Sequence, residues 1–118
     1  MDGINDLTMG VIEYALDGLA KRAEVRAHNV ANLDTPGFMA STVAFEDVLA
    51  AALEDGDLGD LTEPPVVPRP DMPDPLGNTV SLDAEVVEAM KDDLLFDTLI
   101  NSYDFKLEVL RTAIGVRA

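Results

Sequence analysis

The amino-acid sequence predicts an all-α protein with two long helices, one toward each end of the chain, a short extra element and a Pro-rich, largely irregular middle. Apolar residues recur every three or four positions through residues 4–33 and 81–115, which is the helical period. Six of the seven prolines fall within residues 54–79, where they oppose helix formation. The apolar content is mainly Ala, Val and Leu, which favours helix packing over a β-sandwich. We therefore expect one domain, formed by residues 1–53 with 80–118, and an acidic linker or arm at 54–79.

The first long helix, predicted over residues 4–33, carries two apolar stripes. The main stripe, a candidate packing seam, contains Ile12, Leu16, Leu19, Ala23, Ala27 and Val30. A second, adjoining stripe covers the first turns and contains Ile4, Leu7, Val11 and Ala15. Gly10 and Gly18 each weaken the helix by roughly 1 kcal/mol relative to Ala, and we expect them to let another helix approach closely.

Residues 26–38 form the most informative stretch of the chain, because two asparagines and a turn follow each other at the end of the first helical pattern. Asn29 and Asn32 are three residues apart, so they share one face of a helix. Pro36 cannot continue a helix. Pro36-Gly37 fits the two central positions of a type II turn, in which the glycine supplies the positive φ.

The residues after the turn predict a short helix and then the linker. The short element covers residues 39–53, with Thr42 as a candidate N-cap and with Phe45, Val48, Leu49, Ala52 and Leu53 at helical spacing. Residues 54–79 are too rich in proline and acid for a packed core, although a short β-hairpin or an irregular arm remains open there.

The second long helix is predicted over residues 81–115, with Ser81 or Asp83 as its cap. Its apolar seam contains Leu82, Val86, Met90, Phe96, Ile100, Tyr103, Leu107, Leu110 and Ile114, with Asp93 as its one charge. Two such helices bury one stripe each, so the second stripe of the first helix and Phe105 and Val109 are left over. Leftover apolar surface of this kind usually meets a partner, which indicates an assembly component.

Charge and composition exclude several classes of function. The net charge is −15, whereas binding to nucleic acid or to an anionic membrane surface requires a positive footprint. The chain lacks cysteine, which excludes disulfides and thiolate chemistry. No apolar run approaches the ~18 residues of a membrane span, so no direct membrane insertion is expected. The acidic start of the chain also lacks the apolar segment of a cleaved secretory signal.

No catalytic, cofactor or metal site is predicted. His28 is the only histidine and has no zinc-type partner, so we expect it on the helix surface or at an interface. The acidic loop from Asp55 resembles the start of a calcium loop, but Asp60 and Val66 stand where that pattern needs Gly and Glu. A carboxylate cluster without an accompanying base, nucleophile or phosphate loop consists of Asp92, Asp93 and Asp97.

The stretch from Asn29 to Phe38 resembles the N-terminal signature of the flagellar axial proteins, the family of rod, hook and hook-associated subunits. In that signature two asparagines bracket an aliphatic residue and an alanine, and Thr-Pro-Gly-aromatic follows. The matching residues here are Asn29, Ala31, Asn32, Thr35, Pro36, Gly37 and Phe38. His28 stands where several members have Asn or Ser.

Within this family the chain is most similar to the short proximal rod subunits, and the similarity covers residues 7–53 and 80–115. The signature leads into Ala40 and then Phe45-Glu-Asp-Val-Leu49, and the C-terminal helix, including Tyr103, resembles that of one such subunit. A second type of short rod subunit remains as the alternative, although its C-terminal Met-Val run and Arg-Ala-Tyr-x-x-Asn stretch are absent here.

The resemblance implies a structural subunit of the periplasmic flagellar rod, whose terminal helices pair as an antiparallel coiled coil and polymerise. The implied partners are self-copies, other rod and basal-body ring or adaptor proteins, and the type III export apparatus, which exports the chain without a cleaved signal peptide. Phe45 and Leu49 resemble the motif that engages the export gate, but their spacing also fits two core residues. The motif asparagines are expected to bond backbone groups freed at the helix end, at a subunit junction.

Two other classes of function stay open from the residues alone. One is an acidic helical adaptor or chaperone-like binding module, which a stable monomer with a basic client would favour. The other is a small metal-dependent enzyme, which tight stoichiometric metal binding at His28 would favour. The leftover apolar seam and the turn motif favour the assembly component over both.

Overall fold

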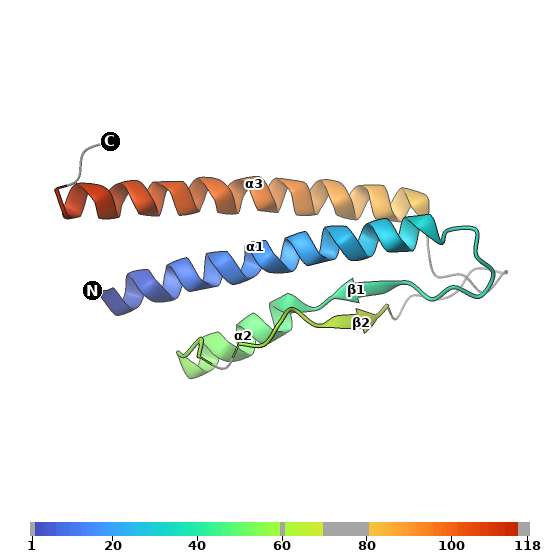
Figure 1. Cartoon of the computed structure of the whole chain (residues 1–118), viewed down its shortest axis with the longest axis horizontal. Helices are drawn as coiled ribbons and strands as arrows, with labels where there is room; N and C mark the ends of the chain where they lie inside the picture. The colour runs from blue at the N-terminus through green and yellow to red at the C-terminus, as the bar shows by residue number, and fades with distance from the viewer. Residues whose placement is uncertain (1, 60, 70–80, 116–118) are drawn as a thin grey trace.

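A computed structural model describes residues 2–59, 61–69 and 81–115, with side chains from residue 7 onward. Within these residues the chain forms three helices and one small sheet, in the order α1 (Asp2–Ala31), β1 (Ser41–Val43), α2 (Phe45–Asp55), β2 (Val66–Pro68) and α3 (Leu82–Ala113) (Figure 1). The two long helices and the small irregular middle confirm the predicted all-α fold.

The helix α1 is the central element of an elongated, flat molecule. It runs antiparallel to α3 on one side and carries the strands and α2 on the other, so the start of α1 and the end of α3 lie at the same end (Figure 1). The molecule extends 61 × 31 × 15 Å, and its radius of gyration is 17.7 Å. A compact globule of this length has a radius of gyration of roughly 13 Å, so much helix surface lies outside the core.

The short middle helix begins later than its sequence pattern predicts. Thr42, the cap that the pattern predicts, lies in β1, and the N-cap position belongs to Ala44, which has no side-chain capping bond. Pairing with a distant strand extends the backbone at Thr42, and local spacing does not reveal that pairing. The helix ends at Gly56, whose φ of 71° allows a Schellman-type end, with the Asp57 N–H donating to the Ala52 carbonyl.

The strands β1 and β2 form an antiparallel pair in which Thr42 lies opposite Val67. The segment 54–79, predicted as a linker or arm, therefore contributes the end of α2 and the strand β2, and its residues 60 and 70–79 lie outside the described residues. Ser81 stands at the N-cap of α3 in extended conformation, but its hydroxyl makes no capping bond.

The core lies where α1 meets β1 and α2. It consists of Tyr14, Ala15, Leu19, Val43 and Phe45, with Val25, Val48, Leu49, Leu61 and Leu99 packed against it. The glycines of α1 make room for this contact. A Cβ on Gly18 would lie 2.3 Å from the Phe45 ring, and one on Gly10 would lie 2.6 Å from the end of the Leu58 side chain. The close approach predicted at both glycines is thus made by α2 and the loop after it.

The helix α3 turns a different face toward α1 than the apolar pattern predicts. In its first half the least exposed residues are Glu85, Ala89 and Asp92, while Met90 of the predicted seam is 67% exposed. In its second half Tyr103, Leu107 and Leu110 are partly buried, but Ile114, directly after the helix, is 73% exposed.

The predicted seam of α1 also contains both buried and exposed residues. Ile12 and Leu19 are buried and Leu16 is half-buried, whereas Ala23 and Val30 are exposed. The predicted charge on the α3 seam, Asp93, is also exposed, and the carboxylate that faces α1 is its neighbour Asp92.

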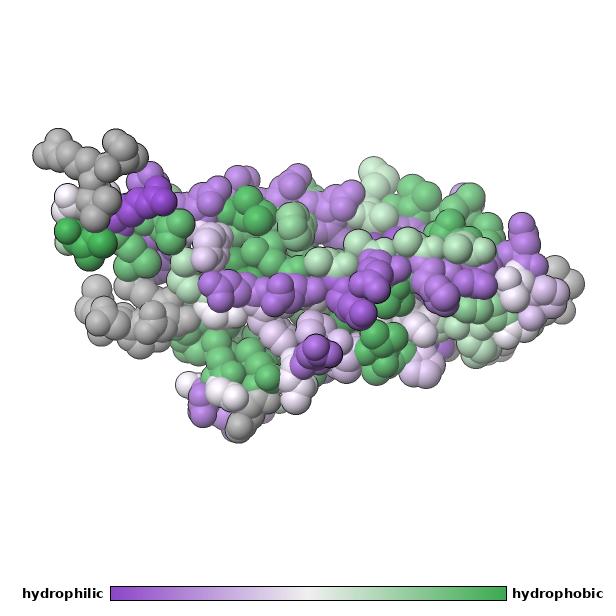
Figure 2. All heavy atoms as spheres, viewed as in Figure 1, coloured by the Kyte–Doolittle hydropathy of each residue, from purple (hydrophilic) through white to green (hydrophobic). Residues whose placement is uncertain are grey.

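Large apolar side chains therefore remain outside along the whole of α3. The exposed ones are Leu82, Val86, Val87, Met90, Leu94, Leu95, Phe96, Ile100, Phe105, Val109 and, directly after the helix, Ile114. Figure 2 shows apolar patches interleaved with polar ones over the α3 edge of the molecule. The surface of α3 is thus more apolar, in its first half, than the face it turns toward α1.

Candidate functional site

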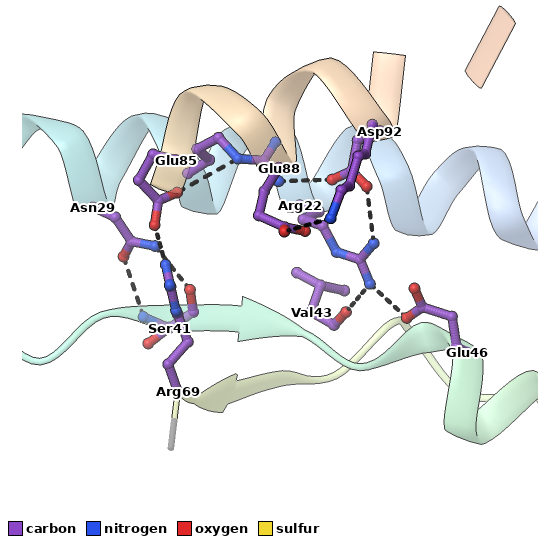
Figure 3. A network of polar contacts seen from close by, with 11 residues as sticks. Arg22, Asn29, Ser41, Val43, Glu46, Arg69, Glu85, Glu88 and Asp92 are labelled. Atoms are coloured by element: carbon purple, nitrogen blue, oxygen red, sulfur yellow. Dashed lines mark hydrogen bonds and ion pairs between the residues drawn. The ribbon is translucent and has the colours of Figure 1, made fainter. Parts of the chain in front are cut away.

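The signature turn lies at the end of α1, and its first asparagine is part of the interior. Asn29 is 2% exposed and makes two hydrogen bonds to the backbone of Ser41 (Figure 3). Its Nδ2 donates to the Ser41 carbonyl at 2.8 Å, and the Ser41 N–H donates to its Oδ1 at 3.1 Å. The amide thus pairs with the inner edge of β1 as a neighbouring strand would.

The second asparagine bonds locally. The Asn32 Nδ2 donates to the His28 carbonyl at 2.9 Å, and the Thr35 hydroxyl donates to the Asn32 Oδ1 at 3.3 Å. The same His28 carbonyl also accepts the Asn32 backbone N–H, so the Asn32 amide bonds a carbonyl at the helix end that already has a partner, whereas Asn29 bonds a different segment. The two residues share a helical pattern but have separate roles.

The turn itself has the predicted geometry. The Phe38 N–H donates to the Thr35 carbonyl at 3.1 Å, and Gly37 between them has a φ of 75°, as a type II turn requires. Pro36 and Gly37 are exposed, as is Ala31. The rings of His28 and Phe38 meet edge to face with centroids 5.8 Å apart, so the exposed His28 contacts an aromatic residue of the motif.

A second feature, which the sequence reasoning missed, is a cluster of ion pairs that we call the arginine clasp. Its members are Arg22, Arg26, Arg69, Glu46, Glu85 and Asp92. They come from α1, α2, α3 and the residue after β2, so the clasp joins all layers of the molecule (Figure 3). The signal was present in the pattern, because Arg22 and Arg26 share one face of α1 and Glu85 and Asp92 share one face of α3.

Arg22 stands at the centre of the arginine clasp. Its Nη2 donates to the Val43 carbonyl at 2.6 Å and also to the Glu46 carboxylate, and its Nη1 contacts Asp92 Oδ1 at 3.3 Å. The guanidinium lies 4.5 Å from the centroid of the Phe45 ring, which adds a cation–π contact. One side chain thus links α1 to β1, α2 and α3.

Glu85 anchors the other end of the clasp and is 3% exposed. It accepts from Arg69, and its Oε2 lies 3.5 Å from the Arg26 Nε, while Arg26 Nη2 donates to Asp92 at 2.7 Å. Glu85 also lies in the first turn of α3, where the helix dipole favours a negative charge. These pairs explain why the first half of α3 turns its polar face inward.

A cleft of about 420 Å³ lies over the clasp and is lined by charged side chains that pair with one another, among them Arg22, Arg26 and Glu85. Within the described ranges, no three His, Asp or Glu side chains gather where they could hold a metal ion. A helix long and apolar enough to cross a membrane is likewise not found in that part of the chain.

Two tyrosines, Tyr14 of α1 and Tyr103 of α3, have a raised pKa. The Tyr103 hydroxyl of α3 donates to the Glu13 carboxylate of α1 at 3.1 Å, and this hydrogen bond raises the pKa of Tyr103. Burial raises the pKa of Tyr14, whose hydroxyl finds no hydrogen-bond partner among the residues the structure describes.

Of the hydrophobic pair Phe45 and Leu49, the first lies in the core and the second is partly buried against it. Phe45 is 2% exposed against Gly18, and Leu49 packs beside it one turn later. In the folded chain the pair thus packs in and against the core, which was the alternative interpretation of their spacing.

The arrangement is that of a helical structural protein, and comparison with known proteins places it in a family. No protein-family model matches the chain. A flagellar basal body rod protein FlgB of Aeromonas hydrophila is 32% identical, in an alignment that covers 92% of this chain and 93% of that protein. The FlgB proteins of Yersinia ruckeri and Yersinia enterocolitica are each 31% identical over 73% of this chain and 77% of theirs. The chain belongs to the FlgB family of flagellar basal body rod proteins.

Proposed function

We propose that this chain is a structural subunit of the proximal rod of the bacterial flagellum, without enzymatic activity, and that it polymerises through α1 and α3. The kinship to FlgB proteins over nearly the whole chain supports this proposal, and it favours that type over the other short rod subunit, FlgC. The partners are self-copies, other rod proteins and the ring or adaptor proteins of the basal body. The place of action is the periplasm.

The exposed apolar residues of α3 are the observation that carries the polymerisation proposal. Leu94 and Phe105 are each 70% exposed, and further large apolar residues surround them on the same helix. Burial of one such side chain contributes about 1.5–3 kcal/mol, so several together provide the driving force for a helix–helix interface. The arginine clasp fixes which face of α3 is turned outward.

Variants of the exposed residues test this interface. Leu94→Glu and Phe105→Glu place a charge on the outer face of α3 without removing a contact from the core. We expect both to fold as the wild type does, by circular dichroism, and to abolish motility in cells that lack the native gene. Leu94→Met and Phe105→Leu are the matched controls and should swim. Normal rods from both charged variants would refute the interface.

Mass spectrometry of purified hook–basal bodies tests the location. We expect the chain in the particle at a few copies with its first residues uncleaved. Its absence from the particle, with abundant protein in the cytosol, would instead support the adaptor class of function.

Export by the type III apparatus is part of the proposal, and it requires the chain to pass unfolded, because in the folded form Phe45 is buried and Leu49 packs against the core. We propose that this pair engages the export gate before folding. Phe45→Ala should therefore reduce secretion. Gly18→Val is the matched control, because it also disturbs the Phe45 pocket but leaves segment 45–49 intact. Equal loss of secretion in both variants would show that the fold, and not the motif, matters.

A further inference from the structure

Among the described residues, β2 pairs with β1 along one edge of its backbone and with no strand along the other, and the hydrogen bonds of the hairpin fix which residues turn toward the unpaired edge. The Ala44 N–H donates to the Pro65 carbonyl at 3.0 Å, and the Arg69 N–H donates to the Ala40 carbonyl at 2.9 Å. In an antiparallel pair the backbone groups of successive residues point alternately toward and away from the partner. Residues 65, 67 and 69 therefore face β1, and residues 64, 66 and 68 face outward.

Prolines occupy two of the three outward positions. Pro64 and Pro68 have no backbone N–H, so Val66 supplies the one donor along this edge. Val66 is half exposed, and no partner for its N–H lies among the described residues. The ladder with β1 does not need an N–H at either outward proline, so the prolines are compatible with the strand.

The opposite edge of the hairpin is closed by different means. Asn29 bonds both backbone groups of Ser41, and Arg22 bonds the Val43 carbonyl, so side chains of α1 occupy the inner edge of β1. An uncovered strand edge is a template for pairing with another chain. The inner edge, on β1, is thus covered by α1, and the outer edge, on β2, has the Val66 N–H as its one backbone donor.

We propose that Pro64 and Pro68 make β2 a terminal strand that a second copy of this chain cannot extend by strand addition. Each proline removes one of the donors that an added strand would need, and its ring crowds the approach. A copy of the acidic chain therefore finds no continuous backbone partner here, although apolar Val66 lies at the edge. Association of copies is restricted to other surfaces. This inference does not depend on the proposed rod function.

The test compares prolines on the two sides of the strand in the full chain. Pro64→Thr/Pro68→Thr creates two outward donors, whereas Pro65→Thr creates one donor that faces β1. We expect the outward double variant to gain thioflavin T fluorescence and the infrared amide band of intermolecular β-sheet, with loss of its soluble peak in size-exclusion chromatography. The wild type and Pro65→Thr should show none of these changes.

Unfolding curves by circular dichroism control for the folding of each variant. Association is measured under conditions in which the wild type and both variants are folded. The proposal would be overturned by a double variant that gains no β-signal, by an equal gain in Pro65→Thr, or by a gain confined to the unfolding range. Polymerisation through α1 and α3 would change the size-exclusion profile without the β-signal, so failure of the rod proposal and failure of this one give different results.

Discussion

The side-chain amide of Asn29 bonds both the N–H and the carbonyl of Ser41, and so serves as the strand partner that β1 lacks on its inner side. The first asparagine of the stretch 29–38 thus has a structural role within the single chain. Removal of the amide leaves two backbone groups of the partly buried Ser41 without partners, and a buried group left unpaired costs about 1–3 kcal/mol.

We expect Asn29→Ala to lower the free energy of unfolding by about 2–4 kcal/mol, because both Ser41 groups lose their partner. Urea unfolding followed by circular dichroism measures this. Asn29→Asp is the informative companion, since it keeps the acceptor for the Ser41 N–H but puts a carboxylate oxygen where the amide donated to the Ser41 carbonyl. An unchanged midpoint in Asn29→Ala would mean that water replaces the amide without cost.

Asn32→Ala should affect assembly more than folding. Its bonds are local and its side chain is half-buried, so we expect a loss of about 0.5–1.5 kcal/mol in unfolding but defective rods in a complementation assay. Gly37→Val is expected to impair rods as well, since a β-branched residue is strained at the φ of 75°. Normal rod incorporation of both variants would refute the expectation.

We expect a larger loss of stability when a carboxylate of the arginine clasp is removed. Glu85→Ala removes a buried carboxylate and leaves Arg26 and Arg69 without it, which should cost about 3–5 kcal/mol. Glu88→Ala on the same helix removes only an exposed pair with Lys91, so it should stay within about 0.5 kcal/mol of the wild type. Equal effects in the two variants would argue against the clasp as the contact that orients α3.

Gly18→Ala and Gly10→Ala should have different consequences. Both gain about 1 kcal/mol in helix propensity. At Gly18 the new methyl meets the ring of buried Phe45, which cannot move freely, so we expect net destabilisation by about 1–3 kcal/mol. At Gly10 it meets the end of Leu58, a partly exposed side chain that can rotate, so thermal unfolding should be unchanged or slightly improved.

We expect Tyr14 to make the folding stability of the chain depend on pH in the alkaline range. Burial raises the pKa of its hydroxyl in the folded chain, so the folded state holds this proton more tightly than the unfolded state does. The stabilisation is present below the unfolded pKa of about 10 and is lost as the pH rises through the folded value. Tyr14→Phe should remove this part of the alkaline loss and leave stability at neutral pH equal or slightly higher, because the buried hydroxyl has no partner in the described part of the chain. A steeper loss of stability at alkaline pH in Tyr14→Phe than in the wild type would contradict this role of Tyr14.

The sequence by itself determined the elements whose cause is local. Apolar spacing located both long helices to within two residues at each end, because helical contacts repeat within one turn. Pro36-Gly37 determined the turn, since proline fixes one φ and glycine permits the positive one. The order of Asn, Thr-Pro-Gly and Phe also pointed to the family that the comparison with FlgB proteins establishes.

Only the tertiary structure decided which faces meet. Thr42 is extended because its partner Val67 lies 25 residues further along the chain, beyond any local pattern. The face of α3 toward α1 is set by the pairing of Glu85 and Asp92 with Arg22 and Arg26, which outweighs the apolar seam because buried charges require partners. Met90 is outside for the same reason. Periodicity identifies apolar positions, but the long-range charge pairs determine which of them remain exposed to bind another subunit.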